Sequence, residues 1–122
     1  MRTAMFMLVG VMAMQPCTPR ARAATFVEDH GRLAVRGTGL VDVRGEPVVL
    51  RGMSLGWHNW WPQYWNEDVV RWMRDDWRCT VLRAAMGVEN DKGYLTDPET
   101  SKRLAKTVVE ACIQSGLYVI LD

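Results

Sequence analysis

The sequence predicts an α/β fold built on a parallel sheet, a prediction that follows from the order and character of its apolar segments. After a pair of short β-type runs, strand-like and helix-like segments alternate along the chain. This alternation is typical of a parallel sheet whose strands are joined by right-handed helical crossovers. The segment 79–86 lacks polar alternation, as expected for a parallel strand buried on both faces. No phosphate-binding glycine pattern follows any strand, so a nucleotide-binding fold has no support.

The predicted elements begin with a small hairpin. Residues 33–35 and 40–43 are short β-type runs separated by the glycine-rich segment 37–39. Residues 44–47 form a turn that contains Gly and Pro. Residues 48–50 are then expected to be the first core strand.

A first helix is predicted after this strand. Asn66 can cap it, and Glu67 and Asp68 lie in the first turn, where the helix dipole favours acidic side chains. One apolar face recurs at helical spacing and comprises Val69, Trp72, Met73 and Trp77. Trp72 and Trp77 are therefore predicted to be core residues rather than ligand contacts.

A second strand, residues 79–86, a polar loop and a second helix follow. Asp97 is the expected N-cap of this helix, with Pro98 at its first position, and Gly116 is expected to end it. Its predicted buried stripe comprises Leu104, Val108, Val109 and Cys112. Residues 117–121 form the predicted third strand.

The composition indicates one folded domain and excludes several classes of partner. The chain has 122 residues, of which 48% are hydrophobic and 24% charged. Its 15 basic and 14 acidic residues are interspersed and give a net charge of +1. Nothing in this balance indicates binding to nucleic acid or to an anionic membrane. We expect no cofactor and no metal.

Residues 1–23 are predicted to be a signal peptide. A positive start precedes the apolar run 4–14, which is too short to span a bilayer. The Ala-Arg-Ala pattern at 21–23 predicts cleavage after Ala23, with Ala24 as the alternative. The folded part is then residues 24–122, secreted to the periplasm or the exterior without a membrane anchor.

The three cysteines are interpreted separately. A lipoprotein would need small residues before Cys17, but Gln15-Pro16 stands there, so we favour cleavage that removes Cys17. Cys79 and Cys112 remain, and in an exported protein they permit a disulfide without demanding one. We favour two buried free thiols.

Aromatic residues are concentrated in residues 50–62, which hold three of the six Trp and one of the two His. The side chains concerned are Trp57, His58, Trp60 and Trp61, with Trp65 close behind. A flat apolar ring with one N–H suits the apolar face of a pyranose. The alternative is that these rings cover the edge of a core. For the loop as a set we favour sugar binding.

A family resemblance appears at several ordered stretches, namely residues 40–42, 45, 47–48, 50–54, 75–77, 80–86, 93–94, 97–98 and 116–122. Together they resemble the start of glycoside hydrolase family 5, the cellulase-type endoglucanases. The resemblance implies a (β/α)8 TIM barrel, which needs about 250 residues. With 99 residues after a 23-residue leader, this chain would supply the hairpin, about three strands and two helices, an incomplete barrel.

The resemblance also implies a retaining mechanism with two catalytic Glu, which the family carries after its fourth and seventh strands. Neither strand is expected in this chain, so we expect the chain itself to be inactive. Glu67, Glu89 and Asp91 are interpreted as solvated loop or helix-start acids and not as catalytic groups.

Five residues are candidate site residues, and three of them receive roles through the resemblance. Arg83, expected at the end of the second strand, would hold the nucleophile ionised and oriented; the alternative is an Arg paired with a structural carboxylate. Trp60 aligns with a family Trp that lines the glycone subsites, and Trp57 and Trp61 are candidate neighbours. His58 would replace the family's loop histidine, although direct alignment puts Gly56 there.

Three functions are compatible with these observations. The first is an exported hydrolase of β-1,4-glucan, monomeric when complete, for which mannan or xyloglucan could replace the glucan. The second is a secreted non-catalytic protein that binds polysaccharide or oligosaccharide through the Trp-rich loop. The third is an inert fragment.

Overall fold

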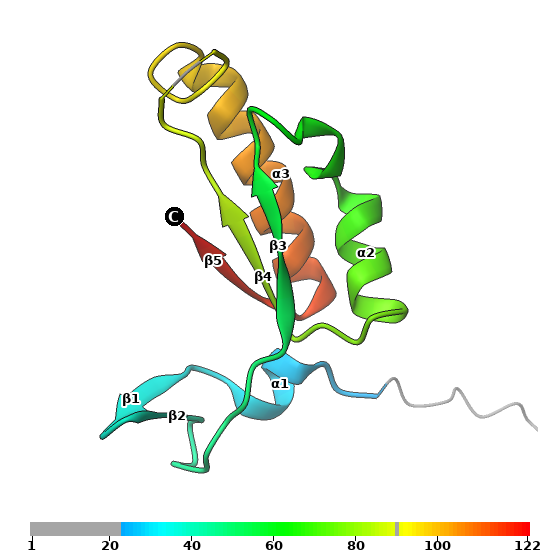
Figure 1. Ribbon diagram of the computed structural model, residues 1–122. Helices are drawn as coiled ribbons and strands as arrows, with labels where there is room; N and C mark the ends of the chain where they lie inside the picture. Colours follow the sequence, from blue (N-terminus) through cyan, green and yellow to red (C-terminus); the bar gives the residue numbers. More distant parts are fainter. Residues whose placement is uncertain (1–22, 90) are drawn as a thin grey trace, which may run out of the picture.

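A three-stranded parallel sheet covered by two helices forms the body of the structure, and a hairpin with a short helix lies at one end of it (Figure 1). The computed structural model describes residues 23–89 and 91–122, so the predicted signal peptide, apart from Ala23, lies outside the described residues. In chain order the elements are α1 (Phe26–His30), β1 (Ala34–Arg36), β2 (Gly39–Val41), β3 (Gly52–Trp57), the 3-10 helix η1 (Pro62–Tyr64), α2 (Glu67–Asp75), β4 (Val81–Ala85), α3 (Pro98–Ser115) and β5 (Tyr118–Leu121).

The sheet has the order β3-β4-β5, and both pairings are parallel, as the alternation of segments predicts. Ser54, Arg83 and Ile120 occupy matching positions on the three strands. Leu82 and Ala84 are fully buried in the core formed with the helices. Because side chains alternate along a strand, Arg83 and its neighbours lie on the opposite face of the sheet.

The first core strand lies further along the chain than the sequence indicates, so the prediction of a strand at residues 48–50 is wrong. Val48 hydrogen-bonds back to Leu40 of the hairpin, while the sheet strand is β3. The first residue of β3 has to be glycine, because a Cβ on Gly52 would lie 1.7 Å from the carbonyl oxygen of Val81. Pairing with β4 therefore overrides the low strand preference of the glycines in β3.

Helix α2 begins as predicted, but only part of the predicted apolar face packs against the core. The Asn66 side chain accepts a hydrogen bond from the Val69 N–H at 3.0 Å. The prediction that Trp72 and Trp77 are core residues is wrong, since they are 47% and 55% exposed. Val70 is the fully buried residue of this helix, and Val69 and Met73 pack partly buried against the core. Trp72 and Trp77 instead line an open groove together with residues of β3.

Helix α3 and β5 follow the sequence prediction closely. Asp97 caps the helix by accepting from the Thr100 N–H at 3.1 Å, and Gly116 ends it with a φ of 67°. Val108 and Cys112 are fully buried, whereas the other two residues of the predicted stripe are only partly buried. Cys79 and Cys112 are both buried free thiols.

The short helix α1 was not predicted, although its cap has a recognisable signature. Thr25 and Glu28 form a reciprocal capping box, and the Thr-x-x-Glu pattern is visible in the sequence. Tyr118 donates a hydrogen bond to the Gly31 carbonyl and so joins this region to β5.

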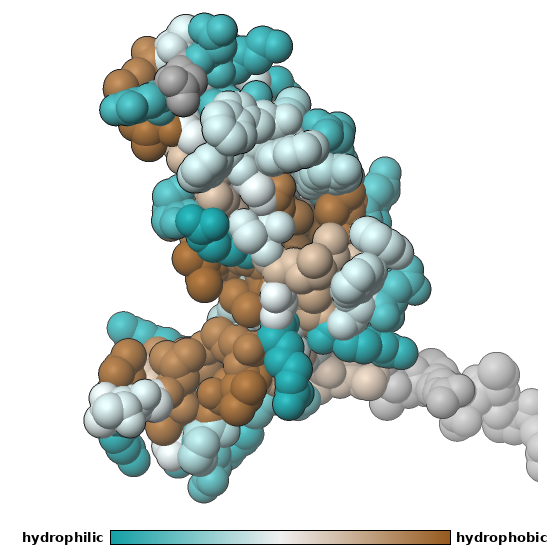
Figure 2. All heavy atoms as spheres, viewed as in Figure 1, coloured by the Kyte–Doolittle hydropathy of each residue, from teal (hydrophilic) through white to brown (hydrophobic). Residues whose placement is uncertain are grey.

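Apolar side chains also gather at the hairpin, where Figure 2 shows a hydrophobic patch. Val35, Leu40, Val43 and Val49 are all exposed large hydrophobic residues.

Among the described residues, none of the helices is both long and apolar enough to cross a membrane.

Candidate functional site

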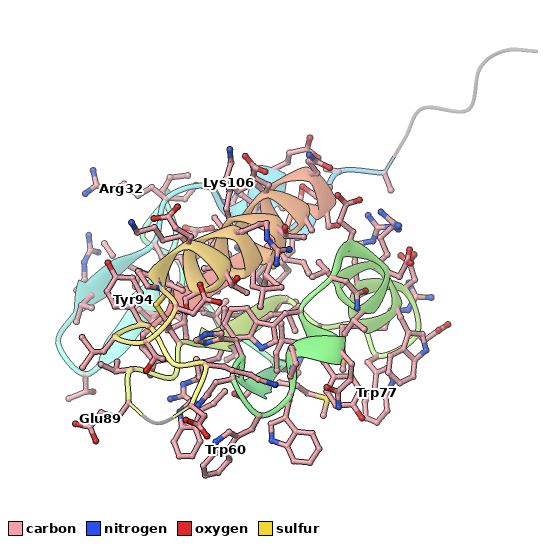
Figure 3. The ribbon with its side chains drawn as sticks, turned by 90° about the horizontal axis from the view of Figure 1, so that it is seen from above. Arg32, Trp60, Trp77, Glu89, Tyr94 and Lys106 are labelled. Carbon is pink, nitrogen blue, oxygen red and sulfur yellow. The ribbon has the colours of Figure 1, made fainter. Side chains whose placement is uncertain are left out.

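The carboxyl ends of β3, β4 and β5 meet at one edge of the sheet because the three strands are parallel. In barrels of β/α units this edge carries the functional loops. Figure 3 views the molecule from this end and shows Trp60 and Glu89 projecting on the same side, from the loops after β3 and β4.

A tight bend at the end of β3 redirects the chain. Gly56 has a φ of 73°, and the register with β4 shifts between Ser54 and Trp57. A Cβ on Gly56 would lie 2.8 Å from Cδ1 of Trp61, so a side chain is excluded there. Residues 57–61, which we call the tryptophan turn, follow the bend. The N–H groups of Trp60 and Trp61 both donate to the Trp57 carbonyl, at 3.1 and 2.9 Å.

The tryptophan turn presents its rings to solvent. Trp57, Trp60 and Trp61 are 48%, 56% and 47% exposed. The rings of Trp57 and Trp60 meet edge to face with centroids 5.0 Å apart, and Trp61 stacks with Tyr64 at 6.2 Å. Trp65, in contrast, is buried in the core and donates its ring N–H to the Gly56 carbonyl at 3.2 Å.

A groove of about 370 Å³ lies beside the turn, between the loops that follow β3 and β4. It is lined by Trp57, Asn59, Trp60, Met86, Gly87, Val88 and Glu89. Its walls therefore combine two aromatic rings with an amide and a carboxylate. This composition suits a sugar, which has apolar ring faces and polar edges.

Arg83 lies in the middle of β4, two residues before the end of the strand, and is half exposed. Its Nε and Nη2 donate to Oδ2 of Asp122 at 3.1 and 2.6 Å, and its Nη1 donates to Oγ of Ser54 at 3.3 Å. Arg83 thus has a carboxylate partner in Asp122. Ser54 and Asp122 were not predicted as site residues, because only the strand register brings them to Arg83.

His58 is in the interior, unlike the Trp residues around it. It is 2% exposed, its Nδ1 accepts from the Gly87 N–H at 3.1 Å, and its Nε2 lies 2.8 Å from Oγ of Ser101. Burial lowers the pKa of the imidazole and favours its neutral form. Both ring nitrogens have protein partners, so this geometry leaves neither free for a direct contact with substrate.

The acidic residues that the sequence set aside are at the surface of the structure. Glu67, Glu89 and Asp91 are exposed, and Glu67 forms an ion pair with Arg71 on α2. Across residues 23–89 and 91–122, no group of three or more metal-ligating side chains gathers in one place.

The comparison with known families decides the assignment. Residues 41–122 match the cellulase family, glycosyl hydrolase family 5. The chain belongs to glycoside hydrolase family 5. It is 40% identical over 102 residues to endoglucanase N of Pectobacterium atrosepticum, covering 84% of this chain and 22% of that protein. It is 38% identical over 105 residues to an endoglucanase of Clostridium saccharobutylicum, covering 86% of this chain and 23% of that protein.

Solved structures of family 5 proteins and related chains share the fold. A structure from Cytophaga hutchinsonii is 56% identical with a TM-score of 0.79, covering 81% of this chain and 32% of that one. The catalytic domain of Thermobifida fusca endoglucanase Cel5A, solved with cellotetraose, is 33% identical with a TM-score of 0.76 and the same coverage. The predicted fold is confirmed: these residues form part of a (β/α)8 barrel. The chain spans about a fifth of the length of the curated relatives it matches.

Proposed function

We propose that this chain forms the N-terminal part of an exported endoglucanase that hydrolyses β-1,4-glucan with retention of configuration. The observation that carries the proposal is the tryptophan turn, which exposes Trp57 and Trp60 at the carboxyl edge of a family 5 sheet. The cellotetraose complex of the Thermobifida relative gives additional support for a cello-oligosaccharide ligand.

In this proposal the groove beside the turn binds the glycone side of the glucan. The face of Trp60 stacks on the apolar face of a pyranose, and Trp57, edge-on to Trp60, closes the platform. Trp61 contributes a neighbouring surface. A stacking platform of this kind acts mainly on substrate binding, because it holds substrate and transition state about equally.

Arg83 would serve the chemistry rather than the binding. A guanidinium has five N–H donors, and Arg83 uses three of them on Asp122 and Ser54. Those bonds fix the plane of the group and leave two donors for a nucleophilic Glu. Beside a guanidinium a carboxylate stays ionised, as a nucleophile requires. The family places both catalytic Glu after strands later than β5, so we expect no turnover by residues 24–122 alone.

A chimera tests this function. Residues 24–122 would replace the matching part of the Thermobifida catalytic domain, which carries the remaining β/α units. We expect the folded chimera to hydrolyse a soluble cellulose derivative and the isolated chain to leave a chromogenic cellobioside intact. A folded chimera without activity, or turnover by the isolated chain, would overturn the proposal.

The second candidate, a secreted non-catalytic binding protein, is favoured by the same exposed aromatic rings. It predicts that the isolated chain is a stable monomer that binds cellotetraose as tightly as the chimera does. Equal affinities in calorimetry, together with an inactive chimera, would favour this alternative.

A further inference from the structure

The tryptophan turn is held from below by one buried residue at its centre. His58 is 2% exposed although it stands beside Trp57 and close to Trp60, which are about half exposed. The ring of Trp65 packs against the imidazole at a tilted angle, with centroids 5.5 Å apart. The turn therefore buries the imidazole of His58 while the rings of Trp57 and Trp60 stay half exposed.

The hydrogen bonds of His58 define a single tautomer. The backbone N–H of Gly87 can only donate, so Nδ1 must be the acceptor and carry no proton. Nε2 then carries the proton and donates it to Oγ of Ser101, which in turn donates to the Asp97 carbonyl at 2.7 Å. The chain of bonds is complete when the imidazole is neutral, in agreement with its burial.

These bonds join three elements at one point. His58 belongs to the turn after β3, Gly87 to the loop after β4, and Ser101 to the first turn of α3. The two loops also touch directly, because a Cβ on Gly87 would lie 2.1 Å from Oδ1 of Asn59. The two walls of the groove are thereby fixed relative to each other and to the helix.

We propose that His58 is a positioning residue, which fastens the tryptophan turn to the β4 loop and to α3 and so holds Trp57 and Trp60 in place for a β-glucan. The glucan in this statement rests on the proposed function, whereas the fastening rests on the contacts alone. Ordering exposed side chains on binding has an entropic cost, and a platform that is ordered beforehand avoids it.

Two variants of similar size separate hydrogen bonding from packing. His58→Leu fills the interior without a donor or an acceptor, and His58→Gln retains an amide donor for Ser101. Ser115→Ala is the matched control, because it removes a buried hydroxyl at the other end of the same helix. The first readout is the order parameter of each Trp side-chain N–H in the 122-residue chain, measured by ¹⁵N relaxation at a dilution where the chain is monomeric.

We expect His58→Leu to lower the order parameters of Trp57 and Trp60, while those of Trp72 on α2 and of Trp77 just after it stay unchanged. His58→Gln should restore part of the order, and Ser115→Ala should alter neither pair. Unchanged order of Trp57 and Trp60 in His58→Leu would overturn the proposal. If His58→Leu does not fold, Ser101→Ala decides by the same measurement: added mobility supports the proposal and unchanged order refutes it.

The second readout is the affinity for cellotetraose, measured by calorimetry. We expect His58→Leu to raise Kd about tenfold and His58→Gln to recover much of the loss. If the wild-type chain binds no cellotetraose but the order parameters change as expected, the result would contradict β-glucan as the ligand. It would not contradict the role of His58 in holding the tryptophan turn. Normal binding by His58→Leu would show that the fastening does not serve the ligand.

Discussion

At the scale of single residues, Arg83 and Trp60 are expected to affect different kinetic constants. In the active chimera, Arg83→Ala removes the group that would hold the nucleophile ionised, so kcat should fall about 100-fold. Trp60→Ala removes a stacking surface, so KM should rise about tenfold with little change in kcat. Steady-state kinetics on one soluble glucan measure both constants. If Arg83→Ala changed KM alone, the role assigned to Arg83 would be wrong.

The two thiols in the core are expected to be unreactive in the native state. Burial raises the pKa of Cys79 and raises that of Cys112 to about 11, so little thiolate exists at pH 8. In residues 24–122, an aromatic disulfide reagent should modify neither thiol until denaturant is added, and then both. Fast modification of the native protein would show that the core opens readily.

The residues that the sequence could identify are those with a local signature. The exposure of Trp57, Trp60 and Trp61 agrees with the aromatic character of their loop, and Asp97 and Asn66 act as caps as their positions predict. The burial of His58 and the pairing of Arg83 with Asp122 could not be predicted. Both depend on partners that are 29 to 43 positions away and that only the strand register and the loop conformation bring close.

At the scale of elements, helices were easier to predict than the first strand. Periodicity and caps place α2 and α3 because both signals are local. Strand β3 contains Gly52, Ser54 and Gly56, which have low strand preference, and it is a strand because β4 pairs with it. The apolar segment 48–50 was the stronger local candidate, but the hairpin engages its first residue through the Val48–Leu40 hydrogen bond.

The N-cap of α2 gives a prediction about stability. Asn66→Ala removes the acceptor for the Val69 N–H and should lower the free energy of unfolding by about 1 kcal/mol. Asn66→Asp keeps an acceptor and should lose far less. Thermal melts of the three proteins measure the difference, and equal melting temperatures would mean that the cap does not stabilise the helix.

The hairpin is held by a buried carboxylate, which gives a prediction about pH. Burial by itself raises the pKa of Asp42. The carboxylate accepts hydrogen bonds from the Glu46 and Arg44 N–H groups and from His30, and it lies beside the charge of Arg44. Together these interactions outweigh burial and lower the pKa of Asp42 below 3.8. A carboxylate whose pKa is lower in the folded state than in the unfolded state stabilises the protein at pH values above its unfolded-state pKa. This stabilisation is lost as the pH falls through the folded-state pKa.

We therefore expect the melting temperature of the wild-type chain to fall between pH 5 and pH 3 by more than that of Asp42→Asn. At pH 7 the variant should be the less stable of the two, because it loses the ionised acceptor. Parallel loss of stability in both proteins over this range would show that other carboxylates control the acid response.

At the scale of the whole molecule, the described sheet is covered on one face only. Helices α2 and α3 pack on that face, and within the described residues β3 and β5 each pair with a single strand (Figure 1). Ile120 and Leu121 are 50% and 51% exposed, and further apolar side chains are exposed at the hairpin. In a closed barrel each strand has two neighbours, so these surfaces are the ones that closure would cover.

The isolated chain is consequently expected to associate with itself through the open sheet. Unpaired strand edges and exposed apolar side chains favour association, and a net charge of +1 provides little repulsion against it. Size-exclusion chromatography with light scattering over a range of concentrations should show species larger than a monomer.

Ile120→Lys places a charge on the open β5 and should shift the distribution toward monomer. Ile113→Lys is the matched control, since Ile113 is 67% exposed on α3, a helix that packs on the covered face. A sharp monomer peak for the wild-type chain, with a cooperative melt, would show instead that three strands and two helices are stable without the rest of the barrel.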